Sequence, residues 1–156
     1  MQIDIKLAMV NTLKKDYSAE NQLKQFDTVR QLLKMNQDVN VHGIARLEEY
    51  VRDTAFSPML RKGLNLVRAG MEPHIIESIL LNTAVANDAD LLESLIITEG
   101  VISIQILCSP DVTMELLLSY FSFDSQEQLG EELREIKINR AVPLSTEEVE
   151  KLLSNR

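Results

Sequence analysis

The fold is set by the stretch SPMLRKGLNLVRAGMEPHIIESILLNTAVA, which runs from Ser57 to Ala86. In its first part, four residues have the spacing that forms a single stripe on a helix: Leu60, Gly63, Leu64 and Val67. Ser57 followed by Pro58 marks the start of this helix, because serine caps free amides and proline suits the first helical position. Gly70 suits the helix end, and Pro73 begins a second helix. The stretch therefore predicts two helices joined by a tight turn.

Similar helix signals occur along the rest of the chain. Ser109 and Pro110 repeat the serine–proline start, and Ser125 with Gln128 and Ser145 with Glu148 have the spacing of a capping box. Strict alternation of apolar and polar residues over a strand length is hard to find. We therefore predict an all-α fold, a single-domain helical bundle over residues 1–156, with helices near 18–36, 39–53, 58–69, 73–86, 89–107, 110–121, 126–137 and 146–154. Within it we expect an N-terminal helical extension (1–38), a core (39–121) and a polar C-terminal helical arm (122–156).

An internal helix-pair duplication is predicted from one recurring distance. Gly63 precedes Pro73 by ten residues, and Gly100 precedes Pro110 by ten, a shift of 37 positions that also aligns apolar residues. A glycine permits close helix packing, and a proline fixes where the second helix begins. We therefore expect structural roles for Gly63, Gly70, Pro73, Gly100 and Pro110. Chance alignment of leucine-rich helices is the alternative.

Composition and charge restrict the partners. With 156 residues, of which 45% are apolar and 26% charged, the chain can fold around one core. Its net charge is −8, and residues 69–133 contain twelve Asp and Glu but no Lys or Arg. Such a block repels nucleic acid and anionic lipid, so we expect no nucleic-acid partner and favour a basic protein surface. A solvated acidic surface that only maintains solubility is the alternative.

No membrane segment is expected. Asp4 and Lys6 interrupt any early apolar run, and the region from Leu91 to Cys108 contains Glu93 and Glu99. We therefore predict a soluble, cytoplasmic protein. Residues 91–107 are apolar on several faces, which favours a central core helix and leaves open a homo-oligomer interface.

Enzymatic chemistry has little support in the sequence. The spacing of His42, His74 and Cys108 matches no metal site, and phosphate-loop and calcium-loop patterns are missing. We predict no enzyme activity, no cofactor and no metal. A buried polar pocket that joined either histidine to Cys108 would reopen the question.

Two parts of the chain resemble a known family. Residues 43–49 (GIARLEE) and 60–73 (LRKGLNLVRAGMEP) resemble the cytoplasmic loop of the flagellar motor stator A subunit family, MotA. Residues 99–105 (EGVISIQ), Pro110 and residues 115–121 (ELLLSYF) are similar to that family's C-terminal cytoplasmic tail. Together these matches cover about half the chain, residues 40–121.

The chain also departs from the family. Two membrane helices lie between loop and tail in the family, whereas only residues 83–89 join the two parts here. Leu107 stands where the first segment has Gly70. The resemblance therefore implies nothing about ion conduction and points to the torque-transmitting cytosolic part alone.

The resemblance implies docking on a rotor through charged side chains. Six residues occupy the matching loop region: Arg46, Glu49, Arg52, Asp53, Arg61 and Lys62. Helix-supporting pairs of Arg52 with Glu48 and Glu49 are the alternative interpretation. We predict a non-enzymatic protein–protein interaction module that docks by charge complementarity on a flagellar rotor or stator component, or on another helical partner. A soluble regulator of motility and a helical scaffold unrelated to the motor are the alternatives.

Overall fold

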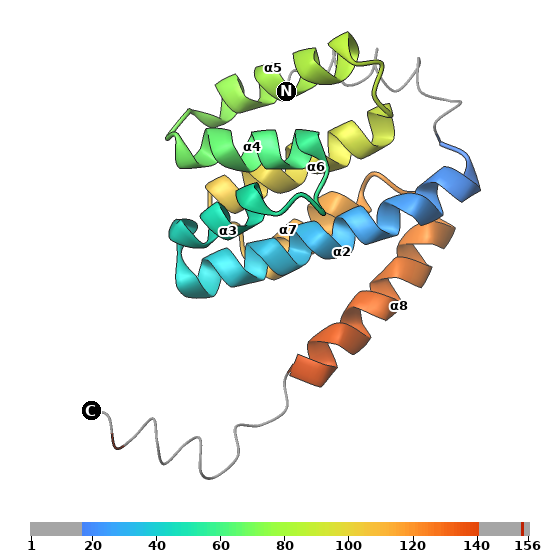
Figure 1. Ribbon diagram of the computed structural model, residues 1–156. Helices are drawn as coiled ribbons and strands as arrows, with labels where there is room; N and C mark the ends of the chain where they lie inside the picture. Colours follow the sequence, from blue (N-terminus) through green and yellow to red (C-terminus); the bar gives the residue numbers. More distant parts are fainter. Residues whose placement is uncertain (1–16, 141–153, 155–156) are drawn as a thin grey trace.

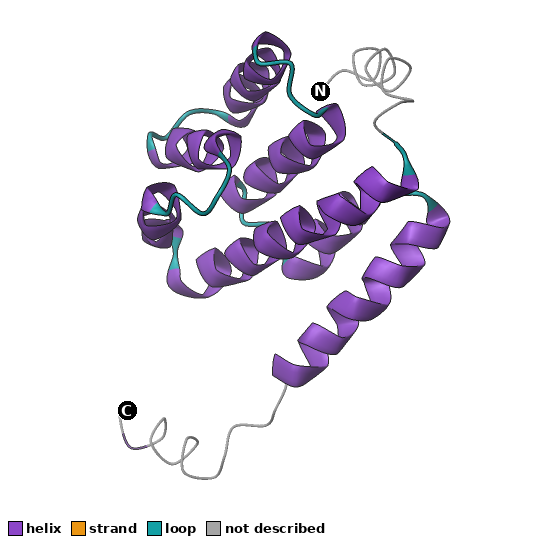
Figure 2. Ribbon diagram, turned by 45° about the vertical axis from the view of Figure 1, so that its right-hand side comes forward, coloured by secondary structure: helices purple, strands orange, loops and turns teal. Residues whose placement is uncertain are grey.

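The described part of the chain is built from helices. The computed structural model describes residues 17–140 and Ser154. Its elements follow in the order α2 (Ala19–His42), the short 3-10 helix η1 (Ile44–Arg46), α3 (Leu47–Arg52), α4 (Pro58–Arg68), α5 (Pro73–Ala86), α6 (Leu91–Gln105), α7 (Pro110–Leu118) and α8 (Phe123–Arg140) (Figure 1). These residues include no strand (Figure 2), which confirms the predicted all-α fold. The helix expected near 146–154 lies, except for Ser154, outside the described residues.

Both serine–proline pairs begin helices at the predicted positions. The side-chain oxygen of Ser57 accepts the amide N–H of Leu60 at 3.3 Å, and that of Ser109 accepts the amide N–H of Val112 at 3.3 Å. Each proline follows its serine as the first helical residue, where it loses no helical hydrogen bond. Local capping chemistry therefore fixes the starts of α4 and α7.

Three predicted boundaries are wrong. The expected break between residues 36 and 39 does not occur, because no glycine or proline stands there, and α2 continues to His42. The single helix expected over 39–53 is instead interrupted at Gly43, whose positive φ ends α2 before η1 and α3 begin. The expected start at residue 126 is also wrong, because Ser122 caps the helix instead of Ser125. The amide N–H of Ser125 donates to the Ser122 side chain at 3.4 Å, and α8 begins at Phe123. The other ends differ from expectation by at most three residues.

Helix α6 lies at the centre of the bundle. It packs against α2, α4, α5 and α7, so neighbouring helices cover its several apolar faces (Figure 1). Its fully or almost fully buried apolar residues are Leu92, Leu95, Ile96, Ile97, Val101 and Ile104. Neighbouring helices of the same chain therefore bury these residues of α6, whereas Ile106 and Leu107 just after the helix are 55% and 50% exposed. Among the described residues, no helix combines the length and apolar content needed to cross a membrane.

Two glycines lie at close contacts between α6 and its neighbours. A Cβ atom on Gly63 of α4 would lie 2.8 Å from the Val101 Cγ2 atom of α6. A Cβ on Gly100 of α6 would lie 2.6 Å from the Leu32 Cδ1 atom of α2. Real Cβ atoms do not approach other heavy atoms this closely, so both helix contacts depend on the absent side chain.

The turns that follow α4 and α6 have the same backbone form. Gly70 and Leu107 both adopt a left-handed conformation, with φ of +75° and +54°. In each turn this residue donates to a carbonyl three residues back, at 3.0 and 3.2 Å. The next residue donates five residues back, at 3.3 and 3.0 Å. This is the Schellman arrangement. The turn after α5 has the same arrangement at Asp88, with φ of +47°, so this local shape is not specific to the two predicted copies, and the duplication stays a prediction.

The matched turns predict opposite effects of two substitutions. Gly70→Ala should lower the free energy of unfolding by about 1 kcal/mol, because the left-handed backbone disfavours a side chain although no atom lies within 4 Å of the new Cβ. Leu107→Gly should raise it by up to about 1 kcal/mol, because it removes that strain from a half-exposed residue. Urea unfolding of both variants measures the two changes, and a loss of stability in both would contradict the prediction.

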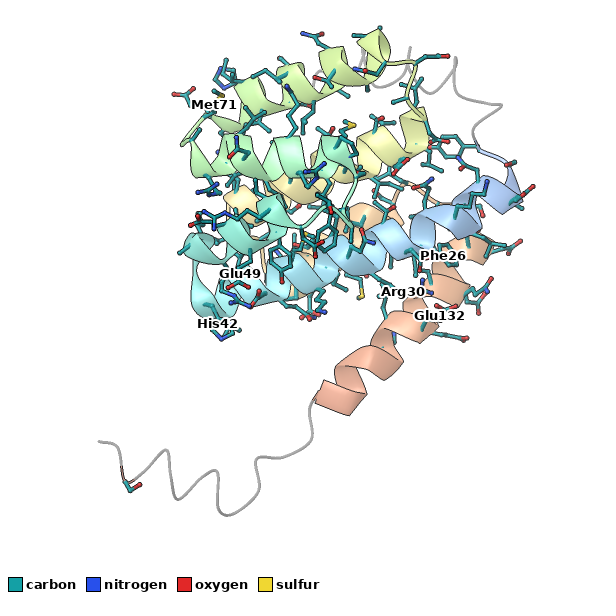
Figure 3. All side chains as sticks on the ribbon, in the orientation of Figure 1. Phe26, Arg30, His42, Glu49, Met71 and Glu132 are labelled. Atoms are coloured by element: carbon teal, nitrogen blue, oxygen red, sulfur yellow. The ribbon has the colours of Figure 1, made fainter. Side chains whose placement is uncertain are left out.

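Helix α8 packs on the body as far as Leu133 and then runs outward from it (Figure 1). Its buried anchors are Leu129 and Leu133. Arg30 of α2 forms an ion pair with Glu132 of α8 (Figure 3). Nearby, the rings of Phe26 and Phe121 meet edge to face with centroids 5.4 Å apart. The segment expected to form a polar arm therefore begins as part of the packed body.

Candidate interaction surface

The structure brings two of the six predicted docking residues together beside α2. Arg46 and Glu49 form an ion pair in which Arg46 Nη1 lies 2.8 Å from Glu49 Oε1. Both line a hollow of about 400 Å³ between the end of α2 and α3. The lining residues of this α2–α3 hollow are Lys34, Gln37, Asp38, Val41, His42, Arg46, Glu49 and Tyr50. Figure 3 shows His42 and Glu49 at this end of the molecule.

Asp38 organises the polar groups of the α2–α3 hollow. Its Oδ2 atom accepts the hydroxyl of Tyr50 at 2.7 Å and Nε–H of Arg46 at 3.1 Å. Its Oδ1 atom lies 2.7 Å from His42 Nδ1. The Asp38 side chain is only 15% exposed. One largely buried carboxylate therefore fixes the positions of three side chains.

The turn at Gly43 explains why these residues meet. Gly43 ends α2 with φ of +87°, and its amide N–H donates to Val39 O at 2.8 Å. This positive φ favours glycine, and it reverses the chain so that η1 packs against α2. The Asp38–His42 spacing of one helical turn was visible in the sequence. The roles of Asp38, Tyr50 and Lys34 were missed, because they depend on this reversal.

The Asp38 network changes the titration of two groups. Burial alone raises the pKa of Asp38, but hydrogen bonds from Tyr50, His42 and Arg46 outweigh it, so the pKa lies below its ordinary value. Burial and then the hydrogen bond to Asp38 raise the pKa of Tyr50 to about 12. At neutral pH the network therefore holds an ionised carboxylate and a neutral phenol.

An Asp38→Asn variant should be less stable than the unaltered protein only at pH values at which Asp38 of the unaltered protein is ionised. Because the folded pKa lies below the unfolded value of about 3.9, the carboxylate stabilises the fold fully above that value and loses the effect as pH falls through the folded pKa. We expect a loss of about 1–2 kcal/mol at neutral pH that shrinks below about pH 4. Urea unfolding from neutral to acidic pH measures it.

The exposed residue Glu115, which lies past the first turn of α7, supplies the control for that titration. Glu115→Gln should change the free energy of unfolding by less than about 0.5 kcal/mol at every pH. If Asp38→Asn destabilised the protein equally at neutral and acidic pH, the ionised carboxylate would not be the source of the stability.

The other four predicted residues lie elsewhere. Arg52 pairs with Glu48 one turn earlier, which is one of the two helix-supporting pairs left open by the sequence. Asp53 follows α3, and its Oδ1 accepts the amide N–H of Ala55 at 2.9 Å. These contacts are local to α3 and its end, and they do not extend the α2–α3 hollow.

Arg61 and Lys62 lie on the neighbouring helix α4. Figure 1 places α3 between the end of α2 and α4. Arg61 Nε–H donates to the backbone oxygen of Phe56 at 3.2 Å. Lys62 is exposed and lines a different hollow. The structure thus divides the six residues among three neighbouring places.

The hollow beside Lys62 was not foreseen from the sequence. It has a volume of about 340 Å³ and lies between the start of α4, the end of α5 and the start of α6. This α4–α5–α6 pocket is lined by Ser57, Pro58, Met59, Lys62, Thr83, Ala84, Asn87, Ala89, Glu93, Ser94 and Ile97. Burial, and secondly the charge of Asp90, raise the pKa of Glu93. No sequence signal marks the pocket, because three separate segments form it.

The α2–α3 hollow does not bring the two histidines and the cysteine together. That hollow includes His42 but neither His74 nor Cys108. His74 Nδ1 lies 3.4 Å from Glu72 Oε2, and both side chains are exposed. Within the described ranges, no group of three or more His, Cys, Asp or Glu is arranged to hold a metal ion.

Comparisons with protein-family models, with curated proteins and with solved structures find no match to this chain. The resemblance to the stator family therefore depends on the sequence segments themselves.

Proposed function

We propose that the protein is a non-enzymatic interaction module that docks on a protein partner by charge complementarity through the α2–α3 hollow. The fixed charge array around Asp38 is the observation that carries this proposal. Arg46 and His42 are held by Asp38, and Arg46 also holds Glu49. Because these side chains are already held in place, a partner that binds them restricts few additional side-chain rotamers, and the entropic cost of binding is lower.

The distribution of charge supports a directed contact. Every Lys and Arg between residues 17 and 133 lies at or before Arg68. Residues 69–133 contain Asp and Glu but no Lys or Arg. Lys34 is exposed beside the hollow, and it has no ion pair among the residues described. Complementary fields steer association and align partners more than they add affinity. Lys34 is the cation that a partner's acidic group would meet at the rim.

The partner proposed first is a component of the flagellar motor, because the resembling segments correspond to the cytosolic part of a stator subunit. A regulator of motility would use the same hollow on a stator or rotor protein. A scaffold outside the motor would bind another helical protein through it. These three functions share a surface and differ in the identity of the partner.

Binding measurements with charge-reversed variants test the proposal. Purified rotor components and purified cytosolic parts of stator components are immobilised separately, and the full chain is offered to each. Lys34→Glu should weaken capture about tenfold, because it replaces attraction by repulsion at the rim of the hollow. The matched control is Lys24→Glu, an equal change of net charge at another exposed lysine of α2.

The outcomes separate the proposals. Binding to a motor component that only Lys34→Glu weakens supports docking in the motor. Equal weakening by both variants would show that net charge acts, not the hollow. Failure of every motor component to bind would contradict the motor connection.

A further inference from the structure

The α4–α5–α6 pocket has the size and walls of a small-molecule site. Its volume of about 340 Å³ falls at the lower end of the range that ligand pockets occupy. Its apolar walls come from Pro58, Met59, Ala84, Ala89 and Ile97. A ligand of a few carbon atoms could bury its apolar part there, and burial of that surface favours binding.

Most polar groups that line the pocket are already used inside the protein. The Thr83 hydroxyl donates to Ile79 O at 2.7 Å, and the Asn87 amide donates to Thr83 O at 2.8 Å. The Ser94 hydroxyl donates to Asp90 O at 2.6 Å. Ser57 caps α4 as described above. These side chains shape the pocket and are committed to its helices.

Two charged side chains of the pocket remain available to bind a ligand. Lys62 of α4 and Glu93 of α6 have neither an ion pair nor a side-chain hydrogen bond within the part of the chain that the structure describes. Glu93 is partly buried, and Lys62 is exposed. A partly buried carboxylate without a partner gains from a ligand that brings a hydrogen-bond donor or a cation.

The opposite charges of Lys62 and Glu93 restrict which charges a ligand can carry. A simple carboxylate would meet Lys62 but would be repelled by Glu93 and the neighbouring Asp90. A simple amine would meet Glu93 but would be repelled by Lys62. We propose that the pocket binds a small zwitterion with an apolar body, such as an apolar α-amino acid. Its ammonium group faces Glu93, its carboxylate faces Lys62 and its side chain lies among the apolar walls.

Three probes of nearly the same shape test this proposal on the full chain. L-leucine carries both charges, isocaproate lacks the ammonium group, and isopentylamine lacks the carboxylate. Calorimetry and amide chemical shifts in NMR measure binding of each. Leucine should bind about tenfold or more tightly than either analogue, since a charge-assisted hydrogen bond contributes about that factor. Shifted amides should belong to the pocket.

Two variants locate the charges. Glu93→Gln should reduce leucine binding to about the level of isocaproate, and Lys62→Gln should reduce it to about the level of isopentylamine. The matched controls Glu115→Gln and Lys24→Gln alter exposed residues outside the pocket and should leave binding unchanged. No binding of leucine at millimolar concentration, equal binding of the three probes, or equal effects of pocket and control variants would overturn the proposal.

The test is independent of the docking proposal. The α4–α5–α6 pocket and the α2–α3 hollow have no lining residue in common. Lys34→Glu should therefore leave leucine binding unchanged, and Glu93→Gln should leave partner docking unchanged. If Lys34→Glu abolished leucine binding, the assignment of the ligand to the α4–α5–α6 pocket would be wrong.

Discussion

A Gly100→Ala variant is expected to lose about 1–2 kcal/mol of unfolding free energy, although alanine is the better helix former by about 1 kcal/mol. The new Cβ would lie 2.6, 2.7 and 2.9 Å from three side-chain atoms of Leu32. Leu32 is fully buried between helices, so its isobutyl group has little room to move. The steric strain between α6 and α2 therefore exceeds the gain in helix propensity.

A double-mutant cycle with Leu32→Ala isolates this contact. Leu32→Ala alone should cost about 2–5 kcal/mol through the cavity that it leaves. In the Gly100→Ala background it should cost about 1–3 kcal/mol less, because the added methyl group then occupies vacated space. Gly130→Ala in α8 is the control, since its Cβ would meet no atom within 4 Å and should stabilise the helix. Additive effects of the two core substitutions would contradict the close approach of α2 and α6.

An Ile96→Ala variant should lose about 2–5 kcal/mol, which is a large part of the stability of a domain of this size. Ile96 is 0% exposed, and it belongs to α6, the helix that packs against α2, α4, α5 and α7. Removal of its outer carbons leaves a cavity that the packed neighbours cannot close fully. Urea unfolding followed by circular dichroism measures the loss.

Ile106→Ala is the matched control for the centre of the bundle. Ile106 follows the same helix but is 55% exposed, so its truncation removes little buried surface. We expect a loss below about 1 kcal/mol. Similar losses for Ile96→Ala and Ile106→Ala would show that α6 is not the central helix.

Local signals predicted the fold well. Ser57–Pro58 and Ser109–Pro110 act through hydrogen bonds and φ restriction within a few residues, so the starts of α4 and α7 follow from the sequence. The continuous length of α2 did not follow from the sequence, because it also depends on the tertiary burial of Leu33, Met35 and Val39. The left-handed Leu107 could not be foreseen either, since bulky residues rarely adopt that conformation.

The candidate site was harder to predict from the sequence than the fold was. Arg46 and Glu49 were predicted as docking residues, but their link to Asp38 requires the reversal at Gly43, which is completed by the packing of η1 on α2. Lys62 was selected as part of a charged loop, whereas its place in the same pocket as Glu93 arises from the packing of α4 on α6. Contacts between distant segments depend on how helices pack, and periodicity gives no register for them.

Charge-directed docking through the α2–α3 hollow is the central claim, and the salt dependence of partner affinity tests it most directly. The dissociation constant of the full chain for a purified motor component is measured between about 0.1 and 1 M salt, where the Debye length falls from about 10 to about 3 Å. We predict that affinity falls steeply with salt in the unaltered protein and less steeply in Lys34→Glu. An affinity that does not change with salt, or an equal slope in both proteins, would contradict docking through this hollow.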